Sequence, residues 1–150
     1  MRGLTLFFAL PLALAGCGDK SAVSLSANIT AGSVTVESSV FGASASGSFD
    51  VLLALGPEAS ASRTVTPQNF QLVSESKAVL ADQLPIETTT PIPITLGKGE
   101  SKTVSFTFKG SMVDHDTACA GPLSIVGAVD DATGSGSQRV ASSGLTPSCD

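Results

Sequence analysis

The stretch that decides the fold class is Thr103-Val104-Ser105-Phe106-Thr107-Phe108-Lys109. Apolar residues occupy every second position, and hydroxyl-bearing or charged residues stand between them. Side chains of a strand point alternately to its two faces, so this pattern places one face on a core and the other in solvent. The stretch therefore predicts a half-buried β-strand.

The same alternation recurs along the chain, and we predict about eight or nine short strands with turns between most of them. Residues 23–29 and 34–38 are expected to form a hairpin around a turn at 30–33. Residues 42–47 are expected to be a small-residue loop, and residues 58–68 a surface connection. The other strands are expected at 49–55, around Phe70 and Leu72, at Val79 and Leu80, along a proline-bearing edge at 88–94, at 123–129 and near Val140.

The composition supports an all-β protein and excludes several functional classes. Of the 150 residues, 22 are Ser, 14 are Thr and only 14% are charged, which argues against a helical bundle. The net charge is −5, and eight Lys and Arg are too few for the clustered cations of a nucleic-acid binder. One His and three Cys cannot furnish a rich metal or redox site.

A longer stretch carries a resemblance to a fold family. The 13 residues Leu96-Gly97-Lys98-Gly99-Glu100-Ser101-Lys102-Thr103-Val104-Ser105-Phe106-Thr107-Phe108 resemble the Gly-Glu-Ser turn and following strand of many bacterial immunoglobulin-like domains. The resemblance implies a fold and no activity, and the chain lacks the core Trp and tyrosine corner of antibody domains. We therefore predict an all-β, antiparallel immunoglobulin-like β-sandwich, as a single domain over residues 22–150 after an N-terminal signal peptide.

The chain begins like an exported protein. Met1-Arg2 supplies a positive start, and residues 4–14 form an apolar run of 11 residues. A membrane-spanning helix needs about 20 residues, so this run has the length of a secretory signal. Residues 1–16 are the predicted signal peptide, removed from the mature protein.

The next residues, Leu14-Ala15-Gly16-Cys17, resemble the lipobox of bacterial lipoproteins. The resemblance implies cleavage before Cys17, a diacylglycerol thioether on its sulfur and an acyl chain such as palmitate on the new amino group. Two or three chains would anchor the protein stably, since each buried CH₂ contributes about 0.8 kcal/mol. The alternative is a plain secretory signal with an incidental cysteine nearby.

This resemblance sets the predicted location. Residues 17–21 would be the lipidated cysteine and a short tether, and the mature chain would have 134 residues and a net charge of −6. Gly18 is not the acidic residue associated with inner-membrane retention, although Asp19 follows it. The outer membrane of the bacterial envelope is therefore favoured over the inner membrane, with the leaflet open.

The cysteines fit this location. If Cys17 carries lipid, Cys119 and Cys149 remain as the one possible intrachain pair, and disulfides persist in exported proteins. The bridge is expected to staple the C-terminal hairpin. The alternative, a metal site with His115, would be one ligand short of a tetrahedral zinc site.

The densest polar cluster is Asp114-His115-Asp116. Its residue types suit metal ligands or a carboxylate-oriented general base, and Asp130 and Asp131 are possible additional ligands. The alternative is a solvated loop that leads into the next cysteine.

Known catalytic motifs are missing from the sequence. It contains neither a Gly-x-Ser-x-Gly nucleophile elbow nor a dinucleotide fingerprint, and residues 97–103 lack the spacing of a phosphate loop. We predict no catalytic residue, no cofactor and no enzymatic activity.

The sequence predicts a lipid-anchored, non-enzymatic cell-envelope protein with a structural or protein-interaction role. Its expected partners are the membrane, through Cys17, and envelope proteins, but not nucleic acid. The alternative is a module that binds a cation or small ligand through Asp114, His115 and Asp116.

Overall fold

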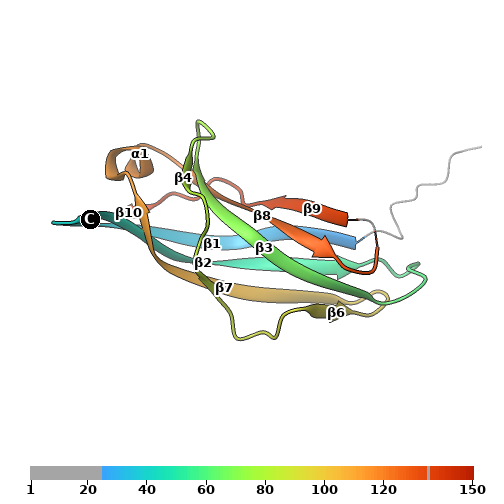
Figure 1. Cartoon of the computed structure of the whole chain (residues 1–150). Coiled ribbons are helices and arrows are strands. Elements are labelled where there is room, and N and C mark those ends of the chain that lie inside the picture. Colours follow the sequence, from blue (N-terminus) through green and yellow to red (C-terminus); the bar gives the residue numbers. More distant parts are fainter. Residues whose placement is uncertain (1–24, 135) are drawn as a thin grey trace, which may run out of the picture.

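The computed structural model describes residues 25–134 and 136–150, which fold into two packed β-sheets with one short helix (Figure 1). The predicted signal peptide, Cys17 and the tether lie outside the described residues. No helix in the described part of the chain is long and apolar enough to cross a membrane.

The first sheet has the strand order β10-β1-β2-β7-β5, and the second has the order β4-β3-β8-β9, with β6 paired to β3. All strand pairs are antiparallel except β1 with β10. This arrangement confirms the predicted all-β, antiparallel immunoglobulin-like sandwich. The elements are β1 (Leu25–Ser39), β2 (Gly42–Leu55), β3 (Arg63–Ser74), β4 (Val79–Ala81), β5 (Ile86–Glu87), β6 (Ile94–Leu96), β7 (Ser101–Val113), α1 (His115–Cys119), β8 (Leu123–Asp131), β9 (Gly136–Ala141) and β10 (Ser148–Cys149).

Four phenylalanines form the centre of the core. Phe49, Phe106 and Phe108 come from the first sheet and Phe70 from the second, and all four are buried. The ring centroids of Phe49 and Phe70 are 4.7 Å apart, and those of Phe70 and Phe106 are 5.4 Å apart. The alternating apolar face of the stretch 103–109 therefore packs directly against the opposite sheet, as its pattern predicted.

The predicted hairpin is wrong, because β1 runs as a single strand from Leu25 to Ser39, through the turn expected at 30–33. A β-bulge between Ile29 and Ala31 shifts the register against β2 by one residue. Ile29 and Val34 are both buried, and their odd spacing is the phase change that a bulge produces. The break in apolar alternation after Ile29 was interpreted as a turn at 30–33, whereas it marks the bulge.

The predicted loop at 42–47 is also wrong, because it forms the first part of β2. Ala43 and Ala45 point into the core, and a second bulge in the pairing with β7 lies between Ala45 and Gly47. A Cβ atom on Gly47 would collide with the backbone oxygen of Ser33 and the ring of Phe108. Small residues occur here because the strands approach closely, not because the chain turns.

Two further boundaries differ from expectation. The connection predicted at 58–68 ends at Arg63, where β3 begins, and Val65 is fully buried. The edge strand predicted at 88–94 is reduced to β6, which starts at Ile94 and pairs with the beginning of β3. The strands predicted at 123–129 and near Val140 are present as β8 and β9, which pair with each other.

Candidate functional site

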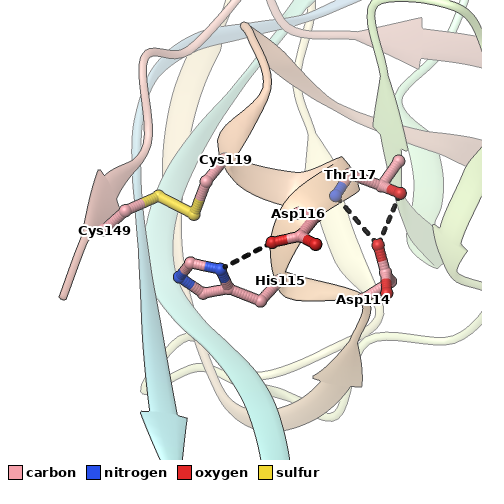
Figure 2. Close-up of a disulfide and its surroundings, with 6 residues drawn as sticks. All are labelled: Asp114, His115, Asp116, Thr117, Cys119 and Cys149. Carbon is pink, nitrogen blue, oxygen red and sulfur yellow. Dashed lines mark hydrogen bonds and ion pairs between the residues drawn. A yellow bond between two sulfur atoms is a disulfide. The ribbon is translucent and has the colours of Figure 1, made fainter.

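Asp114, from the predicted polar cluster, serves as the N-cap of helix α1 (Figure 2). Its Oδ1 accepts hydrogen bonds from the backbone N–H of Thr117 at 2.9 Å and from the Thr117 hydroxyl at 2.6 Å. The first of these bonds satisfies one of the free amide groups at the start of the helix. Both bonds hold the pKa of the Asp114 carboxyl below its ordinary value. The bond from the Thr117 hydroxyl has the larger effect, and the bond from the backbone N–H has the next largest.

The other two residues of the cluster point elsewhere. Asp116 is fully exposed, and its Oδ1 lies 3.5 Å from Nδ1 of His115, on the side of the helix away from the capping bond (Figure 2). The carboxylates therefore do not converge on one point. The region predicted as a solvated loop is instead the first turn of a short helix.

The possible additional ligands, Asp130 and Asp131, do not join this cluster. They lie at the end of β8, whereas α1 immediately precedes the start of that strand. Asp130 accepts a hydrogen bond from the side chain of Gln68, and Asp131 forms an ion pair with Arg63 at 3.3 Å. In the part of the chain that the structure describes, no group of three or more His, Cys, Asp or Glu side chains is arranged to hold a metal ion.

The predicted disulfide between Cys119 and Cys149 is confirmed, with a Cα–Cα distance of 6.2 Å. It joins the last residue of α1 to β10, which pairs in parallel with Thr35 and Val36 of β1. The backbone N–H of Asp150 adds a hydrogen bond to the carbonyl of Val36 at 3.2 Å.

The bridge does not staple the C-terminal hairpin as expected. The hairpin of β8 and β9 lies within the loop that the bridge closes, and its two strands pair in the second sheet. The bridge instead ties the C-terminus, at the edge of the first sheet, to the helix that connects the two sheets.

Sequence reasoning missed an exposed apolar feature at the turn between β1 and β2. Val40 is 93% exposed and Phe41 is 89% exposed, and Met112, near the end of β7, is 61% exposed. Its Cε is 3.1 Å from the position that a Cβ on Gly42 would occupy, so Met112 packs against the turn. We call Val40, Phe41 and Met112 the apolar tip. Its sequence signal is the pair Val40-Phe41 within a segment otherwise rich in Ser, Gly and Ala.

The outer face of the second sheet carries a shallow depression of about 670 Å³. Val73, Val79 and Val126 contribute apolar surface to it, and Lys77 and Arg139 contribute positive charge. Strands β3, β4, β8 and β9 all contribute residues to this face, so sequence spacing alone did not reveal it.

Comparisons with known proteins give no family assignment. No protein-family model matches the chain, and no curated protein matches it. Two solved structures are similar, both of self-complemented MyfA, the major subunit of Myf fimbriae from Yersinia enterocolitica, the second in complex with galactose. Each is 17% identical; the first match covers 83% of this chain and 98% of that chain with a TM-score of 0.39, and the second covers 79% and 95% with a TM-score of 0.36. Similarity at this level does not identify the chain as a fimbrial subunit.

Proposed function

We propose that this chain is a bacterial lipoprotein, anchored through lipid on Cys17, whose β-sandwich has a non-enzymatic structural or protein-interaction role in the cell envelope. The outer membrane is the proposed location, because the residue after the cysteine is Gly18 and not the acidic residue associated with inner-membrane retention.

The observation that carries this proposal is the disulfide between Cys119 and Cys149. It uses two of the three cysteines and leaves Cys17, the one that ends the lipobox-like sequence Leu14-Ala15-Gly16-Cys17. Disulfides form and persist in oxidising compartments, which agrees with export across the cytoplasmic membrane. The bridge and the signal sequence therefore support the same destination by independent chemistry.

The distance between the anchor and the sandwich is short. The first described strand starts at Leu25, eight residues after Cys17. Eight residues span at most about 29 Å when fully extended. A lipid on Cys17 would therefore keep the sandwich within about one domain diameter of the membrane surface.

A strand edge supports the protein-interaction role. On its outer side β1 pairs with β10 at Thr35 and Val36, and no other described strand pairs with that edge. An edge without a strand neighbour presents N–H and C=O groups that a partner strand can complete.

The polar cluster supports a non-enzymatic role, because Asp114 already serves as the cap of helix α1. The Asp114 carboxylate accepts two hydrogen bonds as a helix cap, and Asp116 extends into solvent. The Asp114 cap stabilises the helix that connects β7 and β8, and this role explains why an aspartate stands at position 114.

Fractionation of a bacterium with two membranes, expressing the full chain, tests the anchor. The wild-type protein should sediment with the outer membrane, and Cys17→Ser should be released into the soluble fraction. The matched control is the pair Cys119→Ser and Cys149→Ser, which removes the same chemical groups from the bridge and should leave the protein membrane-bound. Membrane association of Cys17→Ser equal to that of the wild type would contradict the proposal.

A further inference from the structure

We propose that the apolar tip is a docking element for a partner protein, and that this partner offers an apolar socket bordered by basic side chains. The orientation of the apolar tip relative to the membrane rests on the proposed lipid anchor, whereas the exposure of its side chains does not.

The turn does not need the apolar residues that it carries. The Ser39 hydroxyl donates to the carbonyl of Gly42 at 2.9 Å and accepts from the N–H of Phe41 at 3.3 Å. Gly42 has a φ of 117°, which glycine adopts without strain. Ser39 and Gly42 therefore account for the turn geometry, whereas Val40 and Phe41 occupy positions where polar residues normally serve a turn.

Exposed apolar side chains are concentrated at this end of the molecule. Five large hydrophobic residues are exposed in the described part of the chain, and three of them form the apolar tip; the other two are Val79 and Ile92. Contiguous exposed apolar side chains mark interaction sites more often than scattered ones do. A Phe and a Met exposed at the same end of the first sheet have the composition of the aromatic and Met-rich centre of a protein interface.

The base of the apolar tip is braced. Val36, four residues before Val40, pairs with Cys149, which is joined by the disulfide to Cys119 of α1. On the other side, Val113 at the end of β7 pairs with Ala43 of β2. A braced hairpin loses little conformational entropy on docking, which favours affinity.

Exposed carboxylates lie near the base of the apolar tip, and their charge indicates which kind of partner would bind there. Glu37 lies in one cross-strand row with Ser44 and Met112, so its carboxylate belongs to the same outer face as the methionine. We call Glu37, Asp114, Asp116 and Asp150 the acidic collar; all four are exposed and lie on β1, at α1 or just after β10. Lys109, three residues before Met112, is the one cation on the same stretch of β7.

The acidic collar opposes docking to an anionic lipid surface and complements a socket with Lys or Arg at its border. The position of the apolar tip also favours a protein partner over the lipid surface. It lies at the opposite end of β1 from Leu25, and the 15 residues of this strand give a separation of about 46 Å (Figure 1). An anchor on Cys17 would thus direct the apolar tip away from its own bilayer and toward another envelope protein.

Site-specific photocrosslinking in intact cells tests this inference with the full chain. A benzophenone amino acid placed at Phe41 should capture one polypeptide, and the same group at Val79, the matched exposed control on the second sheet, should not capture it. The yield should fall about ten-fold in Val40→Ser with Met112→Ser, because hot-spot side chains contribute at least this factor. It should also fall with Glu37→Lys and Asp116→Lys, and a zero-length carboxyl–amine crosslinker should join the acidic collar to lysines of the same polypeptide.

Capture of a polypeptide without these dependences would also contradict the inference. An adduct with lipid, an adduct with a second copy of this chain, no adduct, or a yield unchanged by charge reversal would overturn it. Fractionation of the same cells separates the two proposals: a released chain that still crosslinks contradicts the anchor, whereas an anchored chain without the adduct contradicts the docking element.

Discussion

Removal of the disulfide should destabilise the sandwich by an amount that follows from the loop it closes. Cys119 and Cys149 are 30 positions apart, so the closed loop contains 31 residues with both ends counted. The chain-entropy relation gives about 3.7 kcal/mol for a loop of this length at 25 °C. A domain of this size has a free energy of unfolding of about 5–15 kcal/mol, so the variant Cys119→Ala with Cys149→Ala should fold but with a much smaller margin. Its midpoint of thermal unfolding should fall by roughly 10–15 °C.

Urea unfolding of the lipid-free domain, followed by circular dichroism, measures this loss. Wild-type protein in reductant should match the double variant, and each single variant should match both, because either change opens the same loop. Hydrogen exchange adds a local test: the Asp150 amide, bonded to Val36, should lose protection first, since β10 has two strand-paired residues. A loss below about 1 kcal/mol would refute the loop-entropy reasoning.

Three further changes test other parts of the structure. In Gly127→Ala the new methyl group would collide with the ring of Phe70, which is 1% exposed, and urea unfolding should show a loss of about 1–3 kcal/mol; Gly121→Ala, where the nearest atom is 3.4 Å away, should stay within about 0.5 kcal/mol of wild type. The lowered pKa of Asp114 means that its charge stabilises the fold above the unfolded pKa and that this contribution is lost as the pH falls through the folded value, so urea titrations should show Asp114→Asn and wild type converging below about pH 4. Added calcium or zinc should leave the thermal midpoint unchanged, and a rise would instead favour the cation-binding alternative.

The sequence predicted those features that depend on the alternation of apolar and polar residues along one strand and on the number of cysteines. The period-2 pattern of 103–109 gave β7, and the one cysteine pair left by the lipobox gave the bridge between Cys119 and Cys149. It failed where two strands approach closely. The small residues of 42–47 and the phase change near Thr30 have the composition of turns, yet long-range pairing with neighbouring strands makes both segments extended.

The polar cluster and the apolar tip show a second kind of limit. Asp114 is of a residue type favoured at a helix N-cap, but α1 has five residues and no helical periodicity that would reveal it. Exposure of Phe41 depends on where strands β2 and β7 end relative to the turn. A pattern along one strand does not contain that information, so the apolar tip required the assembled sheet.

The mass of the N-terminal peptide of the native protein, purified from bacterial membranes, tests the central claim most directly. We predict a peptide that begins at Cys17 and carries the added mass of a diacylglycerol and an acyl chain. A protein that begins at Met1, or a Cys17 without acyl mass, would contradict the claim that this sandwich is held at a membrane by lipid.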